Sequence, residues 1–320
     1  MRYVTEHSLL AGVPVIYLRD TGTKTEVAIA PSLGNRAISM KVHGQEILYW
    51  RPDDLTGMNG IPFLAPWANR IAGGGFQANG QTHKFKDSPQ LRKDANGLAI
   101  HGLLTASPLW EVFETGQASD SAFVTSRLSF SQHPELLANW PFPHEYEMTH
   151  RLSNGALEIS LAIHNQGDQA MPVSVGFHPY FVLPGVPRDN AFAHIAARKR
   201  VVVDSQLVAT GTLTPVELPD RAPLKDHRFD DGFTDLIRDA HGNARFCVEG
   251  AGKRIDVAFG PRYQVAIIYA PPGHEYICFE PMTAITNGVN LAAEGKYPDL
   301  QWVQAGKVWR ESFWITASGF

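Results

Sequence analysis

The heptapeptide LEISLAI, residues 157–163, carries a large apolar side chain at every second position. This period places those side chains on one face of a pleated strand. The preceding run, residues 146–152, has the same period, and Asn154-Gly155 between the two runs is typical of a tight hairpin turn. The two runs are therefore predicted to pair as antiparallel strands.

Strand-like patterns recur along the rest of the chain, whereas no segment has sustained helical periodicity. The 28 glycines and 22 prolines also interrupt the chain too often for long helices. Further strand-like runs occur at residues 15–18, 27–29, 38–42, 123–130, 201–203, 255–259, 265–269 and 313–315. We therefore predict an all-β, mainly antiparallel fold. Residues 204–231, rich in proline and polar side chains, are expected to form a long surface excursion beside a binding face.

No shift in composition, low-complexity linker or internal repeat divides the sequence. Folds built only of strands often reach the length of this chain as one unit. Residues 1–320 are therefore expected to form a single domain.

The charged residues are scattered, and the formal net charge is -4. This excludes a basic stripe for nucleic acid and favours a small neutral or weakly charged ligand. The first residues lack the pattern of a secretory signal, and no segment is apolar for the length of a membrane span. The two cysteines lie in apolar alternating stretches, as buried reduced thiols do. We expect a cytoplasmic protein that contacts neither nucleic acid nor membrane.

Three ionisable residues stand in separate apolar, strand-like segments: His101 in IHG, His178 in GFHPYF and Glu280 in YICFEP. An imidazole with a pKa of about 6.5 exchanges protons near neutral pH. Burial would raise the pKa of a glutamate from about 4.3 towards the range of a general base. This combination suits proton transfer on a neutral polyol. For each histidine alone, a hydrogen-bonded core residue is an equally good interpretation, and the remaining histidines are expected to be surface or structural residues.

The segment 59–71 mixes turn-forming residues with Trp67, Asn69 and Arg70, and we interpret it as a ligand wall. Asn69 and Arg70 offer directed donors for sugar hydroxyls, and Trp67 could present an apolar face to sugar C–H groups. The alternative is an arginine that holds a loop carbonyl and a tryptophan that fills the core. A separate acidic pair, Asp230-Asp231, lies between aromatic residues, and at least one of the two fits an aspartate-rich turn.

Taken in order, these motifs resemble the aldose 1-epimerase family, also called galactose mutarotases. The resemblance extends from about Val15 to Phe313, and its most specific motifs surround His178 and Glu280. The motifs that carry it are Asn69-Arg70-Ile71, His101-Gly102, Asn165 with Met171-Pro172, Gly176 to Phe181, Asp230-Asp231-Gly232-Phe233, and Phe279-Glu280-Pro281 followed by Asn287.

The resemblance implies a large, mainly antiparallel β-sandwich, the galactose mutarotase-like supersandwich, with an open concave face for the sugar. It also implies an isomerase that interconverts the α and β anomers of a hexose without a metal or organic cofactor. Glu280 would take the proton of the anomeric hydroxyl, and His178 would protonate the ring oxygen. His101 would bind near that oxygen and share the acid role. Arg70 would donate to ring hydroxyls, and Asp230 would accept from them.

Asp230 is chosen over Asp231 because it lies three residues before Phe233, as the family aspartate does before its aromatic residue. Val182-Leu183-Pro184 departs from the Asn-Leu pair that often follows the central histidine in the family, so the identity of the sugar stays open. A branch of the family acts on hexose 6-phosphates. Arg198-Lys199-Arg200 is a candidate phosphate site, although such a run is more often a solvated strand end.

Two other classes of function stay open. His101, His178 and Glu280 could be metal ligands of a β-fold enzyme, although such ligands usually include a closely spaced histidine pair. The same cleft could also bind a sugar without turning it over. The oligomeric state is not predicted.

Overall fold

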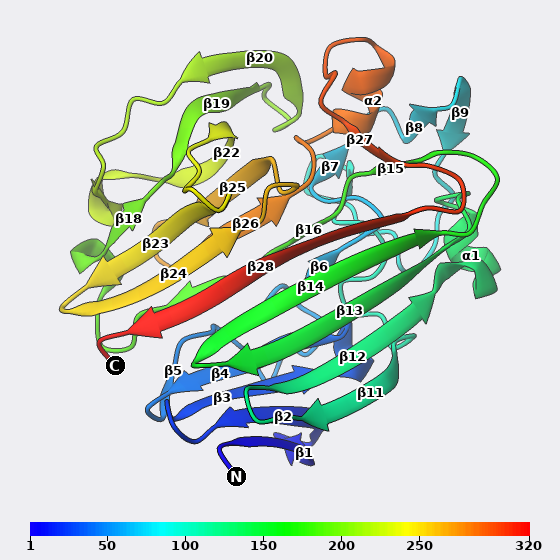
Figure 1. Ribbon diagram of the computed structural model, residues 1–320. Coiled ribbons are helices and arrows are strands. Elements are labelled where there is room, and N and C mark those ends of the chain that lie inside the picture. The colour runs from blue at the N-terminus through cyan, green and yellow to red at the C-terminus, as the bar shows by residue number, and fades with distance from the viewer.

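The structure, a computed structural model, describes residues 1–320 and consists mainly of antiparallel strands (Figure 1). Strands hold 51% of the residues and helices 7%, which confirms the predicted all-β class. The two α-helices are short, α1 (Pro134–Leu137) and α2 (Gly288–Ala293). No helix has the length and apolar character needed to cross a bilayer.

The largest sheet has nine strands and forms the front layer of Figure 1. In spatial order they are β11 (Glu111–Gln117), β12 (Ala122–Ser129), β13 (His144–Ser153), β14 (Ala156–Asn165), β28 (Val308–Ser318), β24 (Lys253–Phe259), β23 (Ala244–Gly250), β18 (Phe192–His194) and β21 (Ala222–Pro223). Strands β13 and β14 form the predicted hairpin, in which Leu152 pairs with Leu157. Asn154 and Gly155 at its tip have φ values of 47° and 75°, the left-handed conformation that a two-residue turn requires.

A second sheet has eight strands and carries most of the candidate site residues. In spatial order they are β20 (Ala209–Pro215), β19 (Ala197–Val203), β22 (Phe229–Leu236), β25 (Val265–Ala270), β26 (Tyr276–Met282), β16 (Gly176–Phe177) and β6 (Phe63–Leu64), while β17 (Tyr180–Val182) also pairs with β26. Residues 204–231, expected as a surface excursion, supply the edge strands β20 and β21, so this segment is more regular than its composition indicated.

The two large sheets pack face to face through aromatic side chains. Phe177 on β16 lies 4.9 Å from Phe313 on β28, and Phe279 on β26 lies 6.1 Å from Phe246 on β23, measured between ring centroids. These rings belong to a continuous cluster of 80 buried residues. Successive side chains of a strand point to opposite faces. The residues that follow Phe177 and Phe279 in the chain therefore point away from this core.

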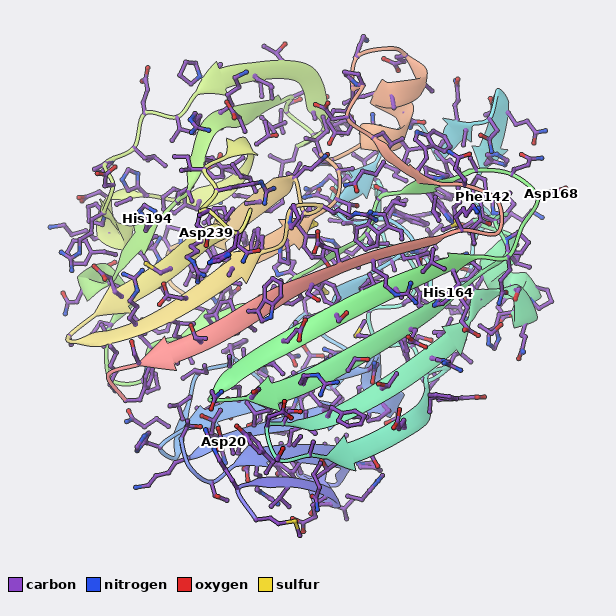
Figure 2. All side chains as sticks on the ribbon, in the orientation of Figure 1. Asp20, Phe142, His164, Asp168, His194 and Asp239 are labelled. Carbon is purple, nitrogen blue, oxygen red and sulfur yellow. The ribbon has the colours of Figure 1, made fainter.

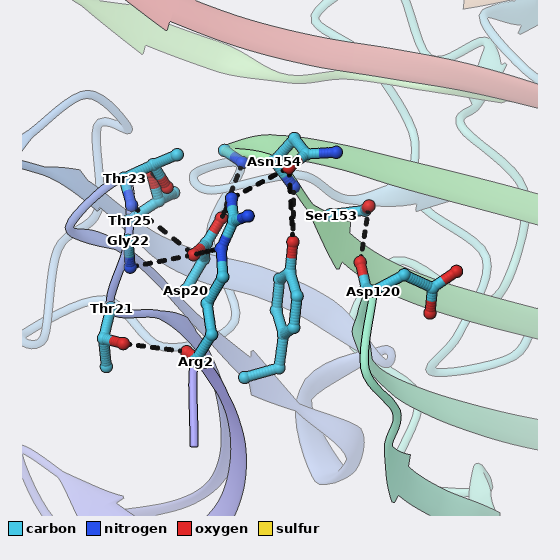
Figure 3. Close-up of polar contacts among 11 residues, drawn as sticks. Arg2, Asp20, Thr21, Gly22, Thr23, Thr25, Asp120, Ser153 and Asn154 are labelled. Atoms are coloured by element: carbon cyan, nitrogen blue, oxygen red, sulfur yellow. Dashed lines mark hydrogen bonds and ion pairs between the residues drawn. The ribbon is translucent and has the colours of Figure 1, made fainter.

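A third sheet of five strands lies at the N-terminal end and is dark blue in Figure 1. Its strands are β1 (Tyr3–Leu10), β2 (Val13–Asp20), β3 (Thr25–Ala30), β4 (Arg36–Val42) and β5 (Gln45–Glu46). The carboxylate of Asp20, at the end of β2, joins this sheet to the β13–β14 hairpin (Figure 3). It accepts from Arg2 Nε at 2.8 Å and from the backbone N–H of Gly155 at 3.1 Å, and Arg2 also donates to Asn154 Oδ1 at 2.8 Å.

Three two-stranded sheets complete the fold. They pair β7 (Arg70–Ile71) with β10 (Ala99–Ile100), β8 (Gly75–Ala78) with β9 (Gln81–Lys84), and β15 (Met171–Val173) with β27 (Gln301–Val303). The first of these matters most for function, because it places the Asn69-Arg70 segment beside the segment that leads into His101.

Candidate functional site

The register of the eight-stranded sheet places His178 opposite Glu280. Gly176 pairs with Met282, and Tyr180 pairs with Cys278. His178 and Glu280 lie midway between these two pairs, so they stand opposite each other. Both side chains point away from the core because Phe177 and Phe279 point into it. The Nε2 atom of His178 lies 3.2 Å from Oε1 of Glu280. Residues 102 positions apart in the chain thus form a direct contact.

This contact is shielded from solvent. His178 is 6% exposed and Glu280 is 1% exposed. The ring of His178 stacks on Tyr180, with ring centroids 4.5 Å apart and ring planes 7° apart. Nδ1 of His178 and Oε2 of Glu280 are buried and have no hydrogen-bond partner within the protein. Both atoms are therefore available to a ligand or a water molecule.

His101 also lies beside His178. Their ring centroids are 5.5 Å apart, and the rings are nearly perpendicular at 81°. The backbone N–H of His101 donates to the carbonyl of Asn69 at 2.9 Å. Gly102 follows with a φ of 67°, and a Cβ atom there would lie 2.1 Å from the carbonyl oxygen of Ala65. Only glycine therefore permits the close approach of backbones that places His101.

Arg70 is held by two side-chain acceptors. Its Nε atom donates to Oδ2 of Asp94 at 2.7 Å, and its Nη1 atom donates to Oδ1 of Asn69 at 3.2 Å. Asp94 in turn accepts the backbone N–H groups of Asn96 and Leu98, each at 2.9 Å. Asp94 does not stand out in the sequence. Its only signal is the turn-forming context Asp94 to Leu98, which does not reveal a partner on another strand.

A small cavity that is open to solvent lies beside Arg70. Asn69, Arg70 and Asp230 line it, together with Ile267, whose strand partner is Glu280. Asp231 also lines the cavity, but its carboxylate forms an ion pair with Arg200. Arg200 is therefore engaged in that pair.

Trp67 does not reach the cavity. Its side chain is 0% exposed and stacks on Phe85, with ring centroids 4.7 Å apart and ring planes 24° apart. A second tryptophan, Trp140, lies 6.0 Å away on the same core cluster. The expectation that Trp67 presents a face to the sugar is therefore wrong. Its ring fills the core between the small sheets and leaves no surface for a ligand.

Several tyrosines that do not stand out in the sequence surround the contact between His178 and Glu280. Tyr180 packs on Tyr276, with ring centroids 5.0 Å apart, and Tyr49 lies at the same distance from Tyr276. Tyr269 lies 6.0 Å from His178. Tyr180 and Tyr269 both pair with Cys278, and Tyr276, Cys278 and Glu280 are every second residue of β26. The three tyrosines therefore lie on the same face of the eight-stranded sheet as Glu280. Aromatic walls of this kind suit the apolar faces of a sugar.

The electrostatics of the site follow from its burial. Burial and the negative charge of Asp230 raise the pKa of Glu280 well above its ordinary value, and the Arg70 cation lowers it in part. Burial lowers the pKa of His178 to about 3. Burial also lowers the pKa of His101 well below its ordinary value, and the nearby His178 lowers this pKa further. Each group alone is thus driven towards its neutral form.

The remaining histidines include His164 and His194. Figure 2 shows His164 on β14 and His194 on β18, both in the nine-stranded sheet. A ring nitrogen of His194 bonds the carbonyl of Asp220 at 2.8 Å. The metal-ligand alternative named His101, His178 and Glu280. The structure instead groups Cys278 with His178 and Glu280, with one donor atom of each within 4.8 Å of the others, and His101 is not part of that group.

Comparisons with known proteins agree with this fold. The sequence profile described as "Aldose 1-epimerase" matches residues 16–316. Galactose mutarotase of Mus musculus is 31% identical over 153 residues, which cover 47% of this chain and 41% of the relative. The uncharacterized protein YihR of Escherichia coli is 28% identical over 142 residues, which cover 44% of this chain and 42% of the relative. These matches span less than half the length of each curated relative.

Solved structures match over the full chain. A galactose mutarotase-like protein from Clostridium acetobutylicum superposes with a TM-score of 0.88 at 22% identity, covering 100% of this chain and 99% of the other. The Slr1438 protein of Synechocystis superposes with a TM-score of 0.76 at 25% identity, covering 100% of this chain and 97% of the other. This likeness confirms the predicted galactose mutarotase-like sandwich.

Proposed function

The chain belongs to the aldose 1-epimerase family, and from this we propose that it interconverts the α and β anomers of a hexose by acid–base opening and reclosure of the ring. The preferred substrate is a free aldose, because the cationic run Arg198-Lys199-Arg200 lies on β19, where Arg198 pairs with Asp235 and Arg200 pairs with Asp231. These ion pairs engage two of the three cations of the run and leave only Lys199 for a phosphate.

The contact between His178 and Glu280 is the observation that carries the proposal. Their facing atoms are 3.2 Å apart, and the two oxygens of a hemiacetal are bonded to one carbon. A pair held this close is suited to serve both oxygens of the same sugar carbon. Glu280 removes the proton of the exocyclic hydroxyl while His178 delivers a proton to the ring oxygen, and the C1–O5 bond breaks.

Reclosure reverses these roles. Rotation about the C1–C2 bond presents the other face of the aldehyde, the ring hydroxyl returns its proton to His178, and Glu280 protonates the carbonyl oxygen. The cycle restores the starting protonation state, so it requires no co-reactant. Burial opposes a charge on either group alone, whereas passing one shared proton between them leaves the net charge of the pair unchanged.

The neighbouring residues hold the sugar. Arg70, fixed by Asp94, donates to hydroxyls in the cavity, and Asn69 and Asp230 line the same cavity. His101 binds near the ring oxygen, since its ring lies 5.5 Å from that of His178. We also propose that residues 1–320 act as one catalytic domain, which the continuous core of 80 buried residues supports.

Polarimetry of freshly dissolved α-D-glucose and α-D-galactose tests the proposal. The wild-type chain should accelerate the change in rotation. Glu280→Gln and His178→Asn should each remove most of the acceleration, because a positioned acid or base contributes roughly a hundredfold or more. His241→Asn and Glu294→Gln, at exposed positions, are matched controls that should retain it.

Full activity in either site variant would overturn the role given to that residue. A wild-type chain that binds the sugar in calorimetry but leaves the spontaneous rate unchanged would instead establish a non-catalytic carbohydrate-binding protein. A panel of free and phosphorylated aldoses in the same assay identifies the substrate.

A further inference from the structure

The acid–base mechanism leaves one donor at the site unused, the thiol of Cys278. Cys278 and Glu280 are two residues apart on β26, so both side chains point to the same face of the sheet. Cys278 is 0% exposed. One ligating atom from each of His178, Cys278 and Glu280 lies within 4.8 Å of the other two, and no other group of three or more such residues in the chain meets this condition.

We propose that His178, Cys278 and Glu280 form a binding site for a thiophilic divalent cation, with Zn²⁺ as its preferred occupant, and that the bound cation inhibits the enzyme. The inhibitory part rests on the proposed epimerase function. The binding part stands on the geometry of the three donors alone.

The donor set selects the metal. One imidazole nitrogen, one thiolate sulfur and one carboxylate oxygen are the ligands of tetrahedral zinc sites, whereas Mg²⁺ and Ca²⁺ prefer oxygen alone. Zinc bonds of about 2.0–2.3 Å place tetrahedral ligands roughly 3.3–3.8 Å apart. The separation of 3.2 Å between His178 and Glu280 already approaches this spacing. The sulfur of Cys278 lies within 4.8 Å of both atoms and would have to move closer to them when the cation binds.

The charges and unsatisfied atoms of the site also suit a cation. Glu280 Oε2 and His178 Nδ1 are buried without partners within the protein, so the carboxylate still has a free acceptor. A thiolate and a carboxylate together balance the charge of Zn²⁺, which removes the cost of burying either anion alone. Binding would release the proton of the Cys278 thiol and the shared proton of the His178–Glu280 pair. Three protein ligands leave the fourth tetrahedral position open to water or to the sugar.

The ligands are pre-positioned by the sheet. The ring of Tyr180 stacks on His178 and supports it. The backbone of Tyr180 pairs with Cys278 and so fixes the strand that carries the thiol. Because the cation would occupy the lone pair of His178 Nε2 and the Glu280 carboxylate, neither group could then exchange a proton with a hemiacetal. We therefore expect inhibition rather than activation.

Binding of Co²⁺ and Zn²⁺ to the full chain tests the site directly. Titration with Co²⁺ should give the near-ultraviolet thiolate-to-cobalt band and the visible bands of tetrahedral cobalt. Isothermal titration with ZnCl₂ should give one ion per chain and the release of about two protons, detected by comparing buffers of different ionisation enthalpy. Cys278→Ser should abolish the thiolate band and weaken zinc binding at least tenfold. Cys247→Ser removes the other buried thiol, on β23, and should change neither.

The mutarotase assay tests the inhibition separately. Zinc should suppress the wild-type rate at concentrations that saturate the site, and a chelator should restore it, while Cys278→Ser should need at least tenfold more zinc relative to its own metal-free rate. Equal zinc affinity in wild type and Cys278→Ser, a missing thiolate band, or a rate that rises with zinc would each overturn the proposal. If Cys278→Ser fails to fold, Glu280→Gln provides the second variant for the binding measurements. Zinc bound as described in a chain without mutarotase activity would contradict the proposed function but not the metal site.

Discussion

The Nε atom of Arg70 donates to Oδ2 of Asp94 at 2.7 Å, and both side chains are largely shielded from solvent, with 14% and 9% of their surfaces exposed. Asp94 also accepts two backbone N–H groups of its own turn, so its carboxylate is fixed before it meets Arg70. The orientation of the guanidinium towards the cavity thus depends on a residue that does not line the cavity.

Asp94→Asn should therefore weaken sugar binding without removing the acid–base pair. We expect KM to rise about tenfold, since losing one charge-assisted hydrogen bond costs roughly 1.5–3 kcal/mol, with a much smaller change in kcat. Asp87→Asn, which alters an exposed carboxylate paired with Lys93, is the control. An unchanged KM, or a loss confined to kcat, would show that Asp94 does not position Arg70.

Arg70→Gln should shift the pH dependence of the reaction. Arg70 lowers the pKa of Glu280, so its removal should raise that pKa further. The pair is active with one shared proton, so loss of that proton from the His178–Glu280 pair ends activity on the alkaline side. The alkaline limb of kcat/KM should therefore move to higher pH, measured by polarimetry after subtraction of the spontaneous rate. A limb that stays in place or moves to lower pH contradicts the electrostatic link.

Glu280→Gln should stabilise the fold while it inactivates the site. Because the pKa of Glu280 is raised in the folded chain, the native state binds its proton more tightly than the unfolded state above the ordinary carboxyl pKa. Stability is then lost as the pH rises from the ordinary carboxyl pKa towards the raised pKa of the folded chain. Replacement with neutral glutamine should raise the free energy of unfolding at pH 7 by roughly 1–2 kcal/mol. Urea unfolding of this variant beside Glu294→Gln provides the measurement, and a destabilised variant would refute the interpretation.

His150 should make the fold acid-labile. This histidine on β13 is 1% exposed, and burial lowers its pKa to about 3. The stability that neutral His150 contributes is fully present above the unfolded pKa of about 6.5. It is lost as the pH falls below that value, with a slope of up to about 1.4 kcal/mol per pH unit. His150→Leu should flatten the fall in unfolding free energy between pH 6.5 and pH 4.5, roughly the start of this window. The exposed replacement His241→Leu should leave the slope unchanged.

Asp20→Asn should destabilise the joint between the N-terminal sheet and the β13–β14 hairpin. The Asp20 side chain is 0% exposed, and burial is outweighed by hydrogen bonds from Arg2, Thr23 and Gly22 that lower its pKa to about 2. We expect a loss of roughly 2–3 kcal/mol at pH 7. The loss should shrink as the pH falls below about 3.8 towards the folded pKa of about 2, because the unfolded wild-type chain then binds a proton that the folded carboxylate does not. A loss that does not change with pH would refute the ionic contribution of Asp20.

Local patterns predicted the fold class well. The alternation in residues 146–163 and the Asn154-Gly155 turn identified the β13–β14 hairpin, because a two-residue turn fixes the register of its own strands. The pairing of β16 with β26 could not be predicted in this way. More than a hundred residues separate Gly176 from Met282, and no turn links them.

The site residues show the same limit. His178 and Glu280 stood out by chemical type, but only the register shows that they touch. Trp67 was placed wrongly because a tryptophan among turn-forming residues has the same sequence signature in a cavity wall and in a core. Cys278 was predicted correctly as a buried thiol, yet its position beside two other donors depends on three-dimensional packing.

Strand β26 serves the core and the candidate site at once, since Phe279 packs against the nine-stranded sheet while Glu280 contacts His178 on the opposite face. No hinge separates these two neighbours in the chain. Activity should therefore be lost in the same cooperative transition as the fold. On gradual heating, we expect the turnover rate to persist until the sandwich unfolds, with no earlier loss from local loosening of an active-site loop.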